Sequence, residues 1–224
     1  MFRNLEINDI TDCVIRFNYS KTINQDVNEK IHQIFKILIS SNIEGLISSY
    51  PTYTELVIRY DPQLISRKNI IEKVIHIEKN FESKKTIKQA VFNIPVKYGG
   101  NYGPDLKNVS EIIGIPELEV IKIHTQNIYH VFMIGFSPGF PYLGGLDKRL
   151  ECPRLATPRI KVNAGSVAIA GNQTGVYPSE SSGGWRIIGK TEIKLFDLSK
   201  NNPSILSPGM KIKFVSIGSL SRLH

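Results

Sequence analysis

The chain has 224 residues, of which 41% are hydrophobic and 21% charged, the composition of a soluble globular protein. That composition excludes collagen-like, low-complexity and wholly disordered chains. The net charge of +8 is spread evenly, at +3 over residues 1–97 and +5 over 98–224, so no basic arm or tract indicates nucleic-acid binding.

The apolar runs are too short for a membrane-spanning helix, and the first residues, MFRNLEINDITDC, lack the apolar core of a secretory signal. We therefore expect no membrane association and a cytoplasmic location. The two cysteines, Cys13 and Cys152, are too few for a disulfide framework or a four-cysteine zinc site. The histidines show no metal-ligand spacing, so no metal site is predicted.

Glycine usage divides the chain into two parts. Residues 1–97 contain one glycine, Gly45, whereas residues 98–224 contain the other 16 and also 9 of the 12 prolines. Glycine and proline mark turns, so the second part consists of short elements joined by tight connections. We predict two domains, 1–97 and 98–224.

The first part has the pattern of a small α+β domain. Hydrophobic periodicity predicts strand, helix, strand, strand, helix and strand, in that order, at residues 14–18, 27–38, 46–50, 55–60, 66–75 and 90–96. Asn24 and Ser66 are suitable N-caps for the two helices. This order is the split βαβ, or ferredoxin-like, arrangement, in which both helices cover one face of an antiparallel sheet.

The second part reads as a β-barrel or sandwich. Short helices are expected near 109–113 and after Pro116, followed by an apolar run at 129–136. Apolar or alternating segments at 166–170, 185–188, 192–196 and 211–215 then alternate with Gly, Pro, Asn and Ser. Closely spaced short strands of this kind are typical of closed β structures.

The segment 135–146, with the sequence GFSPGFPYLGGL, alternates rigid prolines with glycines that tolerate positive φ. Such a loop has a defined shape. It is either the wall of a ligand pocket or a tight barrel corner packed by Phe136, Phe140 and Tyr142, and its residues favour the two interpretations equally.

Arg154 and Arg159 precede a strand bounded by glycines, at 165–175, which carries Ser166, Gln173 and Thr174. Guanidinium groups suit carboxylates and phosphates, and the hydroxyl and amide groups would add hydrogen bonds. The alternative is that both arginines are solvated or paired with acidic residues, as most surface arginines are.

Two further patterns carry less weight. Residues 184–191, GWRIIGKT, match the phosphate-loop motif, but such a loop follows a strand and opens a helix, and the predicted elements supply neither. His124 is a possible general base, although a lone histidine is more often a hydrogen-bonded structural residue. Cys152 has no histidine close to it in the sequence that would be an obvious partner.

Five stretches together resemble the family of 5-oxoprolinase B subunits, also called the allophanate hydrolase subunit 1 or sporulation-kinase inhibitor family. They are YGGNYGPDL at 98–106, the 135–146 segment, ATPR at 156–159, AGSVAIAGNQTGVYP at 164–178 and GGW at 183–185. The resemblance implies an α+β N-terminal domain followed by a cyclophilin-like β-barrel. Such a barrel does not by itself imply prolyl isomerase activity.

Three positions depart from the family pattern. Asn163 stands where proline is common, SESSGGW at 179–185 replaces a Ser-Pro-Gly-Gly-Trp run, and Lys190 replaces a common arginine. The last substitution creates the apparent phosphate-loop match on a strand motif, which weakens that match further.

The resemblance implies the B subunit of a heteromeric enzyme that, with subunits A and C, uses ATP to open the lactam 5-oxo-L-proline to L-glutamate. The chain alone is expected to be inactive, and neither a nucleophile nor the ATP-binding component can be assigned. The substrate-binding residues implied are Arg154, Arg159, Ser166, Gln173, Thr174, Phe140, Tyr142 and His124. Two alternatives are an inhibitor that binds a sensor histidine kinase and the barrel of a split urea-type carboxyltransferase.

Overall fold

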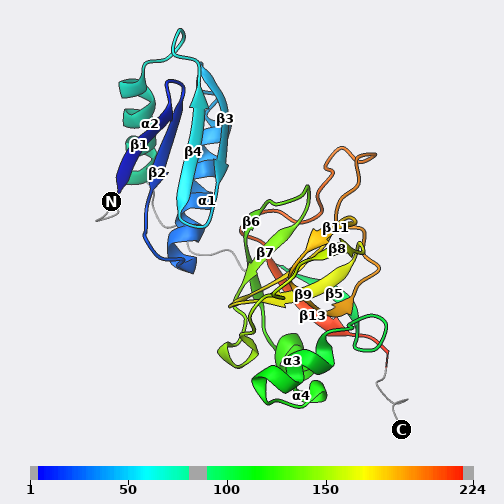
Figure 1. The fold of residues 1–224 in the computed structure, drawn as a ribbon. Coiled ribbons are helices and arrows are strands. Elements are labelled where there is room, and N and C mark those ends of the chain that lie inside the picture. The colour runs from blue at the N-terminus through cyan, green and yellow to red at the C-terminus, as the bar shows by residue number, and fades with distance from the viewer. Residues whose placement is uncertain (1–4, 81–89, 219–224) are drawn as a thin grey trace. The chain divides into compact units, whose positions relative to one another are not determined.

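The computed structural model describes residues 5–80 and 90–218. The chain divides into two compact units, Met1–Lys88 and Gln89–His224. Figure 1 shows the fold of each unit, with helices and strands labelled where there is room and coloured in chain order.

The N-terminal unit is a four-stranded antiparallel sheet covered on one face by two helices (Figure 1). The sheet order is β1-β2-β4-β3, with bounds Glu6–Thr11, Val14–Asn18, Glu55–Tyr60 and Leu46–Pro51. The helices are α1, Gln25–Ser40, and α2, Arg67–Lys79. Both predicted caps are confirmed, because Asn24 accepts from the Val27 amide and Ser66 from the Asn69 amide.

Alternation along the central strands explains why the helices lie on one face only. Ile15 and Phe17 on β2 and Ile58 on β4 are fully buried, and they belong to the same core as Ile31 and Leu38 of α1. The apolar stripes of the helices and the apolar face of the sheet therefore bury each other.

The strand order differs from the split βαβ prediction in two ways. The N-terminal strand β1, which we did not predict, occupies the sheet edge beside β2. The segment 90–96, expected to complete this sheet, belongs instead to β5, Val91–Tyr98, in the second unit. Both assignments depend on pairing between distant segments, which local periodicity does not encode.

The second unit is built on a closed seven-stranded barrel, so the predicted barrel is confirmed. Around the barrel the order is β10-β7-β6-β13-β5-β12-β9. Their bounds are Gln173–Val176, Pro141–Gly144, Tyr129–Ile134, Lys211–Ser216, Val91–Tyr98, Arg186–Lys190 and Ser166–Ala170. The β5–β13 pair is parallel, and the other pairs are antiparallel.

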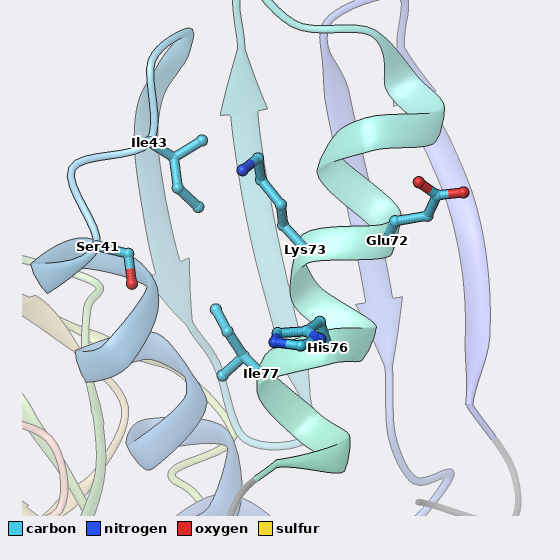
Figure 2. A pocket seen from close by; sticks show the side chains of 6 residues that line it. All are labelled: Ser41, Ile43, Glu72, Lys73, His76 and Ile77. Carbon is cyan, nitrogen blue, oxygen red and sulfur yellow. The ribbon is translucent and has the colours of Figure 1, made fainter.

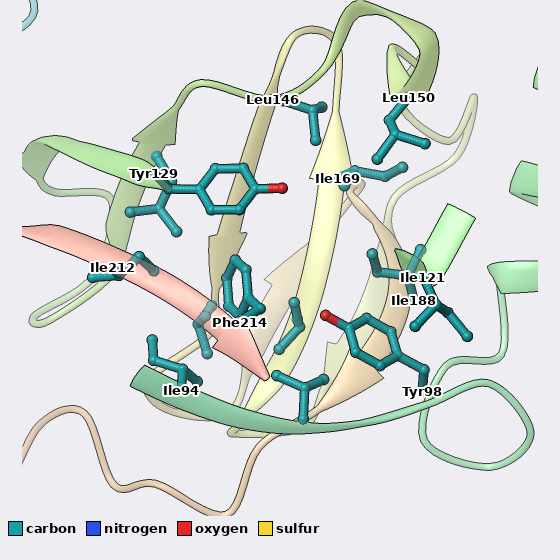
Figure 3. Close-up of a cluster of buried hydrophobic side chains, with 14 of the residues drawn as sticks. Ile94, Tyr98, Ile121, Tyr129, Leu146, Leu150, Ile169, Ile188, Ile212 and Phe214 are labelled. Carbon is teal, nitrogen blue, oxygen red and sulfur yellow. The ribbon is translucent and has the colours of Figure 1, made fainter. Parts of the chain in front are cut away.

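The barrel interior is filled by apolar and aromatic side chains that point inward from the strands (Figure 3). Tyr98, Tyr129 and Phe214 occupy its centre, and Ile94 and Ile212 pack beside them. A closed barrel of this size leaves an interior that side chains fill, so it is a core rather than a ligand channel.

Two helices, α3 (Leu106–Ile113) and α4 (Glu117–Gln126), precede β6, as the sequence predicted. They lie together at one end of the unit (Figure 1). The segment 192–196 is not a strand, contrary to expectation, and forms only an isolated bridge between Phe196 and Ser204. Its alternation arises because Leu195 is buried in the barrel core while its neighbours are more exposed.

A two-stranded ribbon, β8 (Arg159–Val162) with β11 (Ser181–Gly183), and a short 3-10 helix, Lys148–Leu150, complete the unit. The phosphate-loop match at 184–191 falls on strand β12, with no helix after it, which excludes a phosphate loop at these residues. Within the described residues, no helix is long and apolar enough to cross a bilayer.

Candidate functional site

The candidate site lies on the outer face of the barrel wall formed by β9, β10 and β12. Val167 and Ile169 of β9 point into the barrel core, whereas Ala168 and Ala170 belong to a second apolar cluster with Phe140, Tyr177 and Trp185. Because side chains alternate along a strand, this second cluster lies on the opposite, outer surface. The small alanines leave room above the wall for large rings.

Five aromatic side chains form this outer cluster, which we call the aromatic cluster: Phe136, Phe140, Tyr142, Tyr177 and Trp185. The Phe140 ring is central, with ring centroids 5.5, 5.0, 5.2 and 5.5 Å from those of the other four in that order. All four contacts are edge-to-face, the favourable geometry for aromatic pairs.

Gly175 of β10 is necessary for this packing. A Cβ at this position would lie 3.0 Å from Phe140 Cζ and 3.1 Å from Trp185 Cζ3, both tighter than ordinary contacts. Gly175 therefore lets the rings of Phe140 and Trp185 approach the strand backbone. The sequence alone did not predict this role.

The two predicted arginines border the aromatic cluster. The Arg154 guanidinium lies 5.9 Å from the Trp185 ring centroid, within cation–π range. Burial raises the pKa of Tyr177, while Arg154 and Arg159 act in the opposite direction through their positive charge. Both cations therefore lie within electrostatic reach of the same phenol, which makes this part of the surface attractive to an anion.

Arg159 is not wholly available to a ligand. Its Nη2 donates to the carboxylate of Asp105 at 2.6 Å, and that carboxylate also accepts the Ile187 amide at 2.7 Å. These two hydrogen bonds connect three parts of the unit: strand β8, the loop that precedes α3, and strand β12. The Arg159 Nη1 atom is buried and has no hydrogen-bond partner in the described structure, so a ligand would reach it only if neighbouring groups moved.

His124 and Thr174 lie on the other side of the wall, inside the barrel. The two ring nitrogens of His124 pair with Tyr98 Oη at 2.8 Å and Thr174 Oγ1 at 3.0 Å, and its ring stacks on Phe214. Burial lowers the pKa of His124 to about 3. A ligand on the outer face would reach neither residue, and the geometry favours the structural interpretation of His124.

Ser166 and Gln173 occupy opposite ends of the outer face. Ser166 lies at the start of β9, where it pairs with Lys190 of β12. Gln173 lies on β10 and pairs with Ala170, which is four residues after Ser166 on β9. Four strand residues span roughly 13 Å. One small molecule would therefore not contact both side chains, and Gln173 and Ser166 do not converge with Arg159 as a single set.

The structure adds Tyr177, Trp185 and Phe136 to the predicted set. All three lie in the motifs that resemble the family, yet no residue pattern showed that these motifs meet over one stretch of wall. Phe136 is 62% exposed and has a φ of 67°, which is unusual for a bulky residue. Its positive φ is a property of the folded loop that the sequence did not reveal.

The N-terminal unit contains a separate pocket of about 470 Å³ (Figure 2). It lies where the end of α1 meets α2, and it is lined by Ser41, Ile43, Glu72, Lys73, His76 and Ile77. Glu72 points away from the other side chains in Figure 2. None of the predicted site residues lines this pocket. Across the described residues, no group of three or more His, Cys, Asp or Glu side chains is placed to hold a metal.

Comparison with known proteins identifies the family. A family model described as "Carboxyltransferase domain, subdomain C and D" matches residues 5–206. The 5-oxoprolinase B subunit of Bacillus subtilis (strain 168) is 38% identical over 226 residues, covering 95% of this chain and 92% of its own length. The chain belongs to the family of 5-oxoprolinase B subunits.

A second family member, the 5-oxoprolinase B subunit of Escherichia coli O157:H7, is 50% identical over 122 residues. That match covers 54% of this chain and 56% of the relative. The resemblance seen in the motifs is therefore confirmed by whole-chain similarity to the Bacillus subtilis protein.

Solved structures have the same fold. TTHA0988 matches 92% of this chain with a TM-score of 0.82 and 30% identity, and the match spans only 40% of that longer protein. PH0987 from Pyrococcus horikoshii matches 96% of this chain and 99% of its own, with a TM-score of 0.58 and 39% identity. The urea amidolyase of K. lactis shares the fold, at 17% identity and a TM-score of 0.75, over 95% of this chain and 15% of its own.

Proposed function

We propose that this chain is the B subunit of a heteromeric 5-oxoprolinase that opens 5-oxo-L-proline to L-glutamate at the expense of ATP, together with subunits A and C. The supporting observation is the 38% identity to the Bacillus subtilis relative over almost the full length of both proteins. The designation of those relatives as subunits supports a role within an assembly.

The outer-face site suits the substrate of this reaction. 5-Oxoproline is a five-membered lactam ring that carries a carboxylate. Arg154 is exposed and stacks beside Trp185, so its donors can receive a carboxylate, and the aromatic cluster offers a surface for the ring. Tyr142 is only partly buried and adds a phenol at the same edge.

The described residues fit substrate binding better than ATP binding. The phosphate-loop match lies on β12, and no other segment of the described chain presents that motif at the start of a helix. ATP would supply the phosphate that makes the lactam oxygen a good leaving group. We place no ATP contact on this chain, and assign it the holding and orienting of the lactam.

Reconstitution tests the proposal. The purified chain alone should show no 5-oxoproline-dependent ATP hydrolysis, and addition of subunits A and C should produce both ADP and glutamate. A complex of all three subunits that hydrolyses no ATP with 5-oxoproline would contradict the proposal, as would full turnover by the isolated chain.

A carboxyltransferase role is the second candidate, favoured by the description of the matching family model. It predicts transfer of a carboxyl group from a biotin-carrying partner, which the same preparation can test with carboxylated biotin and urea. The histidine-kinase inhibitor remains a prediction from sequence. It requires a decrease in kinase autophosphorylation on addition of the chain, and it needs no catalytic residue.

A further inference from the structure

Phe136 combines two features that rarely occur together. Its backbone is in the left-handed region, at a φ of 67°, although it carries a bulky side chain. The residue is 62% exposed, so burial does not compensate for the unfavourable backbone. Residues held in such conformations cluster at functional sites, where the surrounding structure imposes them.

The exposed ring stands at the edge of the aromatic cluster. Its centroid lies 5.5 Å from that of Phe140 and 6.4 Å from that of Tyr177, both edge-to-face. Phe140 and Tyr177 are almost completely buried, which leaves Phe136 as the ring most accessible to a ligand among these three. The adjacent Ser137 hydroxyl is buried and has no hydrogen-bond partner in the described structure.

The cationic edge of the cluster lies beside Trp185. Arg154 is exposed and approaches that ring to 5.9 Å, and Trp185 and Phe136 both contact the same central ring, Phe140. An apolar ring and a guanidinium therefore border one buried aromatic centre. This combination suits a small ligand with a flat ring and a carboxylate.

We infer that Phe136 is a substrate-contacting, specificity-determining residue, whose exposed ring packs against the lactam ring while Arg154 holds the substrate carboxylate. This inference rests on the proposed 5-oxoprolinase function. It assigns the strained backbone at Phe136 to the presentation of the ring, and it identifies the exposed rim of the aromatic cluster as the substrate surface.

The test compares four forms of the reconstituted complex: wild type, Phe136→Ala, Phe136→Gly and Phe136→Tyr. Loss of the ring should raise the KM for 5-oxoproline at least 10-fold in both Phe136→Ala and Phe136→Gly, about the effect of one lost apolar contact, with a smaller effect on kcat. Phe136→Tyr keeps the ring and should restore most of the affinity. Leu118→Ala, which truncates an exposed leucine on α4, is the matched control and should leave both constants unchanged.

Stability separates the backbone from the ring. Phe136→Gly should melt at a higher temperature than Phe136→Ala, because glycine adopts positive φ without the Cβ penalty, whereas elsewhere alanine is the more stable of the two. Equal loss of affinity with unequal melting temperatures would show that the ring, and not the loop backbone, binds the substrate.

Three results would overturn the inference. Unchanged KM in Phe136→Gly, in a complex that turns over 5-oxoproline, would contradict it and leave the proposed function standing. Loss of assembly with subunits A and C, measured by gel filtration, would assign Phe136 to an interface within the complex instead. A wild-type complex with no 5-oxoproline-dependent activity would contradict both proposals at once.

Discussion

At the scale of single residues, Arg159 has two possible roles that a substitution can separate. It is paired with Asp105, whose side chain is only 9% exposed, and it also borders the aromatic cluster. Lys161, two residues away, pairs with Glu180 at 2.7 Å, but these side chains are 63% and 58% exposed. Solvated pairs of that kind contribute little to stability.

We expect Arg159→Ala to lower the free energy of unfolding by about 1–3 kcal/mol, because it leaves the buried Asp105 carboxylate without its cation. Lys161→Ala should cost less than about 1 kcal/mol. In the reconstituted complex, Arg159→Ala should also reduce turnover roughly 10- to 100-fold, if its remaining donors bind the substrate. Urea unfolding and steady-state kinetics measure the two effects.

Arg159→Lys is the informative control, since it keeps a cation for Asp105 and removes the planar fork. If Arg159→Ala is folded, assembles with its companion subunits and turns over at the wild-type rate, Arg159 acts only through Asp105. Its assignment as a substrate-binding residue would then be wrong.

The buried imidazole of His124 predicts a pH dependence of stability. Burial lowers the pKa of His124 from 6.5 to about 3 in the folded chain. Below pH 6.5 the imidazole therefore binds a proton in the unfolded chain, while it stays neutral in the folded chain. The free energy of unfolding should therefore fall as the pH drops from about 6.5 towards 3. One group contributes at most about 1.4 kcal/mol per pH unit.

The measurement is urea unfolding between about pH 4.5 and 6.5, within the window that the two pKa values define, followed by fluorescence of Trp185, the single tryptophan of the chain. His124→Gln should remove up to one proton from the slope of stability against pH, whatever its effect on absolute stability. Lys122→Gln, on the exposed side of the same helix, should leave the slope unchanged. Parallel curves for His124→Gln and wild type would refute the prediction.

At the scale of elements, the turn between β5 and α3 is held directly against strand β12. The Gly99 amide donates to the Ile188 carbonyl at 3.1 Å, and the Asp105 amide donates to the Ile187 carbonyl at 2.9 Å. Gly103 lies between these two bonds, and a Cβ there would lie far inside contact distance of the Ile188 carbonyl oxygen. The glycine is required by close approach of two backbones.

Gly103→Ala should therefore destabilise the barrel unit by at least about 3 kcal/mol, because the backbone cannot withdraw without breaking those hydrogen bonds. Gly114→Ala is the control. Gly114 ends α3 with a φ of 69° and has open space around its Cβ position, so its substitution should cost only about 1 kcal/mol. Equal losses for the two variants, in urea unfolding followed by Trp185, would contradict the close-approach argument.

At the scale of the whole molecule, the assignment of β5 decides where one unit ends. β5 pairs with β13 over six residues in parallel and with β12 on its other side. It also contributes Ile94 and Val96, both fully buried, to the barrel core. A division at 97/98, as glycine usage suggested, would take this strand from the barrel.

Two fragments test the division at 88/89. A fragment of residues 89–224 should unfold cooperatively, with Trp185 fluorescence reporting the transition. A fragment of residues 98–224 keeps only Tyr98 of β5, so β12 and β13 would lose their shared neighbour and the barrel would open. It should show no cooperative transition and should bind a hydrophobic dye. Cooperative unfolding of the shorter fragment would restore the 97/98 boundary.

Much of this protein was determined by local sequence. Caps at Asn24 and Ser66, apolar periodicity in α1, and the short strands β9 and β13 all follow from interactions within a few residues. The five motifs were sufficient to identify the family, and the barrel followed from that resemblance and from the turn-rich composition. These features need no knowledge of distant contacts.

Tertiary structure alone decided which face each predicted site residue occupies. Thr174 points into the barrel because the pairing of β10 with β9 determines which of its side chains lie inside. His124 reaches the same interior from helix α4, and Arg154 borders the outer surface from a segment outside the strands. The pairing of Arg159 with Asp105 joins residues 54 positions apart. Such contacts, like the pairing of β5 with β13, arise only when closure of the barrel brings distant segments together, and no local pattern in the chain specifies them.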